Sequence, residues 1–293
     1  MNLDGRRESS NVEDRRGMSA GRKVGIGGIG GLIIAGIITL LMGGNLGDVL
    51  QNAGQLGGMT SAEQYNTDPS QFSEQEQQLA EFSKKILAGT EDVWSKIFRE
   101  NGLGEYRAPT MVLYTGSTST GCGQGSAQMG PFYCSADQCL YIDLSFFSSM
   151  KQQLGADGDF AYAYVIAHEV GHHVEYLTGT LSKAHQQMSR LSETEANRVS
   201  VRIELLADFY AGVWAHHDNK MFNSLEDGDL EKAIKCAQVI GDDYLQKRAQ
   251  GYDIPESFTH GTSAQRMRWL KLGLSTGDFR RGGQAFQLPD SQL

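Results

Sequence analysis

The residues whose types and spacing could do chemistry lie in the segment His168-Glu169-Val170-Gly171-His172. In an α-helix, residues four positions apart share one face, so His168 and His172 can direct both imidazoles at one ion. This is the H-E-x-x-H zinc arrangement. Glu169 is turned about 100° around the helix from His168, which suits it to act on water beside the ion rather than on the ion. The pattern predicts zinc bound by the two histidines, with Glu169 as general base.

The segment around these residues favours a buried helix. Residues 161–176, AYAYVIAHEVGHHVEY, are apolar almost all round, which is typical of an element inside a core. Gly171 costs about 1 kcal/mol relative to Ala in a helix interior, so we expect a backbone or a substrate to approach closely there. The adjacent His173 points elsewhere and is interpreted as a surface or hydrogen-bonded histidine rather than a ligand.

A catalytic zinc site needs a third protein ligand and an open position. The metzincin pattern would require Gly at position 175 and His at position 178, but the sequence has Glu175 and Thr178. A glutamate on a following helix is the other solution, and Glu204 in the segment ELLAD fits it. Asp208 shares its helix face and could accept the free N–H of a ligand histidine. The alternative is a solvated face on which Glu204 pairs with Arg202.

Periodicity and capping signals predict an α+β fold, mostly helical with a small β-sheet. Capping boxes at Ser73 and Ser192 predict helices that run to Arg99 and to about His217. Further helical patterns cover residues 225–250 and 263–272, with a loop at 255–261 between them.

Two apolar runs, Met111–Tyr114 and Leu140–Phe147, are strand candidates. Zinc proteases commonly hold an extended peptide by strand addition to a sheet edge beside the metal, and Leu140–Phe147 is the candidate for that edge. The alternative, an internal strand, stays equally open.

The composition limits the function classes. The 293 residues carry a formal net charge of -9, which argues against a nucleic-acid partner, because a polyanion binder needs a basic face. No basic cluster lies outside the N-terminal 23 residues, which hold six basic and four acidic side chains. We expect one catalytic core with extensions.

An uncharged stretch follows this N-terminal segment. Residues 24–44 contain no charged side chain and are long enough, at about 1.5 Å per residue, to cross a bilayer core of about 30 Å. The positive-inside rule then predicts a cytoplasmic tail (residues 1–23), one transmembrane helix (24–44), a flexible linker (45–72) and an exported domain (73–293) on the periplasmic side. A cleaved signal peptide is the alternative.

Four cysteines, Cys122, Cys134, Cys139 and Cys236, follow this stretch. In an exported domain they can form disulfides. Cys122 and Cys134 bracket a short glycine-rich loop and are the favoured pair, which would leave Cys139 for Cys236, although four cysteines allow three connectivities.

Several segments together resemble one bacterial family. HEVGHH, ELLAD, GPFYC followed by YIDLSFF, FTHGTSAQR and the N-terminal GRRESSNVEDRRG resemble the YpfJ-like neutral zinc metallopeptidases. The resemblance covers nearly the whole chain. It implies a zincin of the gluzincin type, with His168, His172 and Glu204 as zinc ligands, Glu169 as general base and Asp208 behind a ligand. Gluzincins also place a late histidine and arginine near the metal, which assigns His260 to oxyanion stabilisation and Arg266 to the same task or to orienting a site carboxylate.

The leading functional hypothesis is a membrane-anchored zinc peptidase that acts on a peptide or protein substrate. A second hypothesis is an envelope binding or assembly protein that keeps zinc without catalysis; the intact Glu169 counts against it. A third is a zinc amidohydrolase that acts on cell-wall material.

Overall fold

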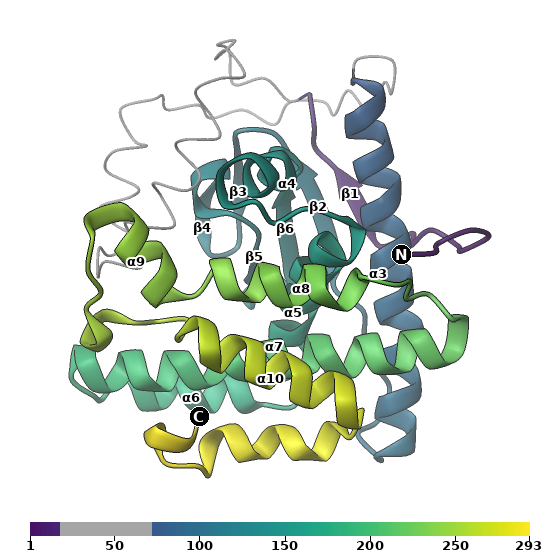
Figure 1. Cartoon of the computed structure of the whole chain (residues 1–293). Coiled ribbons are helices and arrows are strands. Elements are labelled where there is room, and N and C mark those ends of the chain that lie inside the picture. Colours follow the sequence, from purple (N-terminus) through teal and green to yellow (C-terminus); the bar gives the residue numbers. More distant parts are fainter. Residues whose placement is uncertain (18–71) are drawn as a thin grey trace.

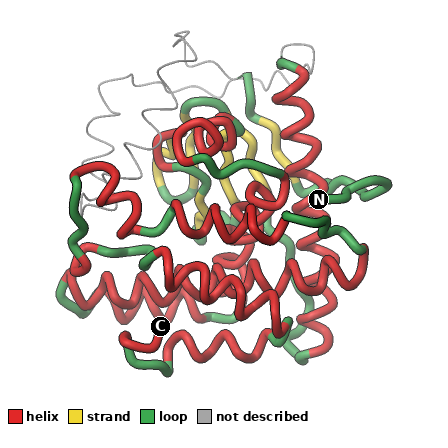
Figure 2. The backbone as a smooth tube through the Cα atoms, in the orientation of Figure 1, coloured by secondary structure: helices red, strands yellow, loops and turns green. Residues whose placement is uncertain are grey.

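The computed structural model describes residues 1–17 and 72–293, and shows helices packed around a small sheet (Figures 1 and 2). The sheet has the strand order β1-β2-β6-β5, with β1 at Val12–Asp14, β2 at Thr110–Tyr114, β6 at Cys139–Asp143 and β5 at Phe132–Cys134. β1 and β6 are parallel to β2, whereas β5 is antiparallel to β6. The edges of this sheet are therefore β1 and β5.

The two faces of the sheet pack differently because side chains alternate along a strand. Met111 and Leu113 of β2 enter the main core with the helices. Val112 and Tyr114 point to the other face, where a smaller cluster includes Cys134. A separate hairpin of β3 (Ser117–Thr120) and β4 (Gly123–Ser126) follows β2 along the chain.

The cysteines fit the sequence prediction in part. Cys122, at the turn of the β3–β4 hairpin, forms a disulfide with Cys134 in β5, as predicted. The predicted disulfide between Cys139 and Cys236 is wrong, because both thiols are free. Cys139 packs on the cluster that contains Cys134, whereas Cys236 lies in the main helical core, 3.7 Å from the sulfur of Met150. The two thiols thus belong to different faces of the sheet.

In Figure 1 most of the long helices lie below the sheet, and one runs along its side. α5 packs against α3, α7 and α8, and α10 packs along α7. The helices are α3 (Glu74–Glu100), α4 (Ser145–Ser149), the π-helical η3 (Met150–Leu154), α5 (Asp159–Leu177), α6 (Thr180–Met188), α7 (Glu193–Phe222), α8 (Asp229–Val239), α9 (Asp242–Gln250) and α10 (Ser263–Thr276). Short 3₁₀ turns are η2 (Ala127–Met129), η4 (Pro255–Ser257), η5 (Phe279–Phe286) and η6 (Asp290–Gln292).

The capped helices agree with the sequence. Ser73 and Ser192 cap α3 and α7 through capping boxes, as predicted, and a third capping box begins α10. The prediction of one helix over residues 225–250 is wrong, because this segment forms two helices, α8 and α9, that are separated at Gly241. A Cβ atom at Gly241 would lie 2.4 Å from the backbone nitrogen of Ser263, so this position permits a close approach to the start of α10.

The strand candidate Leu140–Phe147 ends earlier than predicted, and of the two places left open for it the structure shows the internal one. β6 stops at Asp143, whose side chain accepts hydrogen bonds from the backbone N–H groups of Gly116 (2.7 Å) and Ser145 (2.9 Å). The chain then turns into α4. β6 is also an internal strand between β2 and β5, so it is not the exposed edge for a substrate.

Residues 1–17 pack on the domain and are called the N-terminal strap here; the sequence had suggested a separate tail. The strap contributes β1, which is hydrogen-bonded to β2. Arg6 pairs with the buried Asp218 of α7 at 2.8 Å, and Ser9 donates a hydrogen bond to Glu91 of α3 at 2.5 Å. The ordered domain therefore includes residues that precede the predicted start at Ser73.

The predicted membrane span (24–44) lies outside the described residues, as does the predicted linker except Phe72. Within residues 1–17 and 72–293, no helix combines the length and the apolar character that a bilayer crossing requires.

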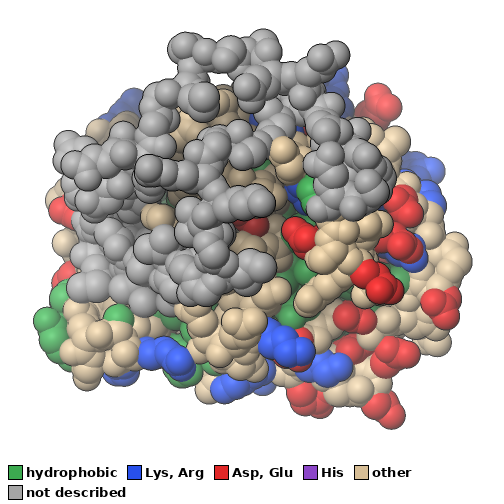
Figure 3. Space-filling model, turned by 90° about the horizontal axis from the view of Figure 1, so that it is seen from above, with side chains coloured by type: hydrophobic (Ala, Val, Ile, Leu, Met, Phe, Trp, Pro, Cys, Tyr) green, Lys and Arg blue, Asp and Glu red, His purple; other side chains and the backbone are tan. Residues whose placement is uncertain are grey.

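In the view from above (Figure 3), acidic and basic side chains are interspersed along the exposed rim.

Candidate metal site

The site is built where α5 and α7 come unusually close. A Cβ atom on Gly171 of α5 would lie 3.0 Å from the Cα and carbonyl oxygen of Ala207 in α7. Glycine therefore allows the two backbones to approach, as the sequence suggested. This contact sets the third predicted ligand, Glu204, one helical turn from Ala207 and opposite the histidines of α5.

The three predicted ligands converge. Nε2 of His168 lies 3.1 Å from one carboxylate oxygen of Glu204, and Nε2 of His172 lies 3.4 Å from the other. One donor atom from each of the three residues lies within 4.8 Å of the others. Ligand atoms about 2.0 Å from a tetrahedral zinc ion are about 3.3 Å apart, so these spacings suit such an ion. Arg202 does not pair with Glu204, because it bonds Asp290 and the carbonyl oxygens of Ala285 and Leu288.

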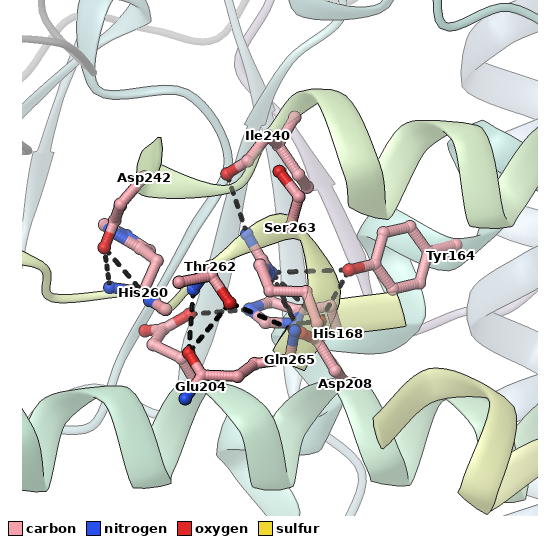
Figure 4. Close-up of polar contacts among 12 residues, drawn as sticks. Tyr164, His168, Glu204, Asp208, Ile240, Asp242, His260, Thr262, Ser263 and Gln265 are labelled. Carbon is pink, nitrogen blue, oxygen red and sulfur yellow. Dashed lines mark hydrogen bonds and ion pairs between the residues drawn. The ribbon is translucent and has the colours of Figure 1, made fainter. Parts of the chain in front are cut away.

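The second ring nitrogen of His168, Nδ1, is held by the carboxylate of Asp208. Nδ1 lies 2.8 Å from Oδ1 of Asp208, which is fully buried. Tyr164 donates a hydrogen bond to the same oxygen at 2.5 Å, and Arg266 binds both carboxylate oxygens (Figure 4). Burial would raise the pKa of Asp208, but Arg266 and His168 outweigh it and lower this pKa to about 2. Asp208 therefore stays ionised and fixes the ring of His168 with Nε2 toward Glu204.

A second carboxylate does the same for His172. Glu175, one turn further along α5 and fully buried, places Oε2 2.9 Å from Nδ1 of His172. Burial raises the pKa of Glu175 to about 7 against the opposing effect of His172. Both histidines thus have one nitrogen anchored by a carboxylate and the other directed at Glu204, which is the arrangement that metal-binding histidines commonly show.

The electrostatics of the three ligands favour a bound cation. Burial opposes ionisation of Glu204, yet His172 and His260 lower its pKa well below the ordinary value. Burial would lower the pKa of His168, but Asp208 and Glu204 raise it to about 9. The ionised carboxylates of Glu204 and Asp208, together with the carboxyl group of Glu175, therefore surround two imidazoles. The donor set fits zinc, which binds neutral imidazole and carboxylate and would replace the protons on the rings.

The predicted base lies in the same buried helix. Glu169 is 7% exposed, and burial raises the pKa of its carboxyl group although both ligand histidines act in the opposite direction. A carboxyl group with a raised pKa holds a proton more readily than one in water, which suits a group that accepts a proton and later returns it.

His260 approaches the site from the loop before α10. Figure 4 shows it beside Asp242, with Glu204 close enough to act on its charge. Asp242 is fully buried and accepts hydrogen bonds from the backbone N–H groups of His260 (2.7 Å) and Gly261 (3.0 Å). Its other oxygen lies 3.4 Å from Nδ1 of His260, an ion-pair distance. Burial lowers the pKa of His260, but Glu204 and Asp242 outweigh it, so the pKa is raised.

The structure thus brings together His168, Glu169, His172, Glu204, Asp208, His260 and Arg266. Arg266 bonds Asp208, Tyr164 and the carbonyl oxygen of Ile240. Of the two roles expected for it, these contacts favour the orientation of a site carboxylate. Sequence analysis missed Tyr164, Glu175 and Asp242. The first two lie four residues before His168 and three residues after His172, on shared helix faces, so helical spacing could have identified them.

His173, interpreted as a hydrogen-bonded histidine, is not a ligand. It is fully buried and lies 2.9 Å from the hydroxyl of Tyr133 and 2.7 Å from the carbonyl oxygen of Arg107. Burial lowers its pKa to about 4, so the ring is neutral at pH 7.

This geometry defines a protein with a candidate metal site of two histidines and one glutamate on neighbouring helices. Over residues 1–284 the chain matches the family described as "Putative neutral zinc metallopeptidase", and it belongs to that family.

Relatives agree with this membership. "Uncharacterized protein YpfJ" of Escherichia coli strain K12 is 49% identical over 284 residues, which cover 95% of this chain and 96% of the relative. "Uncharacterized protein Rv2575" of Mycobacterium tuberculosis is 40% identical over 183 residues, 59% of this chain and 61% of the relative. No solved structure matches the chain.

Proposed function

We propose that this protein is a zinc-dependent metallopeptidase of the gluzincin type. The observation that carries the proposal is the convergence of His168, His172 and Glu204, with donor atoms within 4.8 Å of one another and each imidazole anchored by a buried carboxylate. A purely structural zinc site would need neither a buried glutamate next to a ligand nor an adjacent loop histidine. Glu169 and His260 supply both.

The roles of the side chains follow from this geometry. A zinc ion held by the three ligands would acidify a water molecule and polarise the carbonyl group of a substrate. Glu169 accepts the proton of that water and delivers it to the leaving amine. His260, held by Asp242, donates a hydrogen bond to the oxyanion that develops on the substrate. Asp208, Glu175 and Arg266 keep the two ligand imidazoles in place.

We propose β5 as the strand that holds an extended peptide. β6 is internal, whereas β5 is an edge of the sheet and packs against the metal helix α5. An edge strand can offer backbone donors and acceptors to an added strand. The disulfide between Cys122 and Cys134 ties the β3–β4 hairpin to β5, which limits the movement of this edge.

We propose further that the N-terminal strap and the catalytic domain lie in one compartment. β1 and β2 are hydrogen-bonded neighbours, so a single membrane crossing between Gly17 and Phe72 would separate strands that pair. The disulfide favours an oxidising compartment for both. Membrane association through residues 24–44 stays a hypothesis, in which the chain enters and leaves on the same side.

Zinc content and proteolysis of the purified full chain test the peptidase proposal. We expect one zinc ion per chain in the wild type and in Glu169→Gln, and hydrolysis of unfolded protein in the wild type alone. Glu204→Ala should lose zinc, whereas Glu193→Gln, an exposed glutamate at the start of the same helix, should keep both properties. Zinc in the wild type and in Glu169→Gln without hydrolysis in either would support the binding-protein alternative.

The compartment can be tested with two introduced cysteines at exposed positions, Ser10→Cys in the strap and Glu231→Cys in α8. Intact cells would be treated with a membrane-impermeant maleimide, with the wild type as background. Equal labelling at both positions supports one compartment. Labelling at Glu231→Cys and protection at Ser10→Cys would restore the single-crossing topology.

A further inference from the structure

His173 connects the metal helix to two separate parts of the fold. Its Nε2 faces the carbonyl oxygen of Arg107 at 2.7 Å, and a carbonyl oxygen only accepts hydrogen bonds, so Nε2 carries the proton. In a neutral ring Nδ1 is then an acceptor, and the hydroxyl of Tyr133 donates to it across 2.9 Å. Both nitrogens of this buried imidazole are therefore used, one toward each neighbour.

The two partners occupy informative positions. Tyr133 is the central residue of β5, the edge strand. Arg107 lies in the segment that leads into β2, the strand that joins β1 to β6. His173 directly follows the ligand His172, so one turn of helix carries both a metal ligand and the tie to the sheet. The ring of Tyr133 also meets the ring of His173 edge-on, with centroids 5.4 Å apart.

β5 is short, so directed side-chain contacts matter for its position. The strand has three residues, and within the described part of the chain it pairs on one side only, with β6. Its other contacts include the disulfide at Cys134 and the stacking of Phe132 on Tyr141 at 5.0 Å. A purely space-filling role for position 173 would be met by an apolar side chain, without two directed hydrogen bonds to different segments.

We propose that His173 is a positioning residue that fixes edge strand β5 against the metal helix, so that the strand can receive an extended peptide beside the metal ligands. This inference rests on the proposed peptidase function. In this inference His173 supports the binding of substrate by β5, and it neither binds zinc nor transfers a proton.

A pair of matched tyrosine variants tests the inference. Tyr133→Phe removes the hydrogen bond to His173 and keeps the aromatic ring. Tyr176→Phe is the control, because its ring stacks on the same imidazole (centroids 6.4 Å apart) while both ring nitrogens are already used by other partners. Zinc content and thermal unfolding establish that each variant is folded and loaded.

Amide hydrogen exchange of residues 130–135 reports the position of β5 without any substrate. We expect about fivefold faster exchange in Tyr133→Phe, the factor that corresponds to one ordinary hydrogen bond, and no change in Tyr176→Phe. With fluorescently labelled casein as substrate, KM should rise by about the same factor in Tyr133→Phe, while kcat stays within about twofold.

Unchanged exchange in Tyr133→Phe, or equal acceleration in both variants, would overturn the positioning role. A fall in kcat at constant KM would overturn the assignment to substrate binding. If the wild type binds zinc but hydrolyses nothing, the peptidase proposal fails, and with it the peptide-binding purpose of β5, whereas the exchange contrast still shows whether His173 holds the strand.

Discussion

Arg266 binds the carboxylate of Asp208 through two hydrogen bonds, from Nε to Oδ2 at 2.8 Å and from Nη2 to Oδ1 at 3.0 Å. Both side chains are buried, at 3% and 0% exposure. The same carboxylate holds Nδ1 of His168, so an arginine on α10 is linked to a candidate metal ligand on α5 through a carboxylate on α7. Three helices from distant parts of the sequence are thereby joined at one point (Figure 4).

Removal of this arginine should damage stability and metal binding together. Arg266→Met leaves Asp208 as a buried charge without its cation, and we expect a loss of about 3 to 5 kcal/mol in the free energy of unfolding. Urea unfolding of the zinc-free protein measures this loss. Arg268→Met, an exposed arginine two residues along the same helix, is the control and should change stability by less than about 1 kcal/mol. Equal effects of the two substitutions would contradict the structural importance of the Arg266–Asp208 pair.

Glu175 offers a test of the second anchored histidine. Glu175→Gln keeps the size of the side chain but removes the carboxylate that faces Nδ1 of His172, so zinc affinity should fall by about 10- to 100-fold. Competition with a fluorescent chelator measures the affinity, with Glu193→Gln as the control. An unchanged zinc affinity in Glu175→Gln would show that His172 needs no carboxylate behind it.

The parts of the fold that sequence predicts are those with local signals. Capping boxes and apolar periodicity identified α3, α7 and most of α10, because hydrogen bonds at a helix start involve neighbours in sequence. H-E-x-x-H and ELLAD identified the three candidate ligands for the same reason, since helical spacing fixes which residues share a face. The same spacing rule could have identified Glu175 as a partner of His172, but in the sequence this residue served only to exclude the metzincin pattern.

The parts that sequence missed depend on distant partners. β1 and β5 have three residues each, too short for an alternating pattern, and they become strands only by pairing with β2 and β6. The strap is rich in charge and resembles a solvated tail until Asp218 and Glu91 are placed beside it. The pairing predicted for Cys139 failed because sequence does not reveal which face of a sheet a side chain occupies.

The strap provides a prediction from two adjacent arginines. Arg6 is 10% exposed and pairs with Asp218, which is 1% exposed, whereas Arg7 is 48% exposed and pairs with Glu91 and Asp92. Breaking a buried pair costs about 3 to 5 kcal/mol and breaking an exposed one about 1 kcal/mol or less. Arg6→Met should therefore lower the urea midpoint of the full chain far more than Arg7→Met does. Comparable midpoints would mean that the strap does not stabilise the domain.

His260 should give hydrolysis a characteristic dependence on pH. Burial lowers the pKa of His260, but in the zinc-free protein Glu204 and Asp242 outweigh it and raise this pKa above the ordinary value of 6.5. Asp242 is not a candidate ligand, so its effect persists when zinc binds Glu204. A protonated imidazole donates to an oxyanion more strongly than a neutral one, so the group is most effective below its raised pKa. kcat should therefore fall as the pH rises through that value.

Two substitutions separate this effect from other titrations. His260→Gln should lower kcat by about 10²- to 10³-fold at neutral pH, because the charged donor is lost, and the decline with rising pH should disappear with it. Asp242→Asn removes one of the charges that raise the pKa, so the decline should move to lower pH. Zinc content should stay at the wild-type level in both variants, since neither residue is a ligand. If His260→Gln retains the wild-type decline, another group is responsible for it, and His260 returns to the status of a loop residue near the metal site.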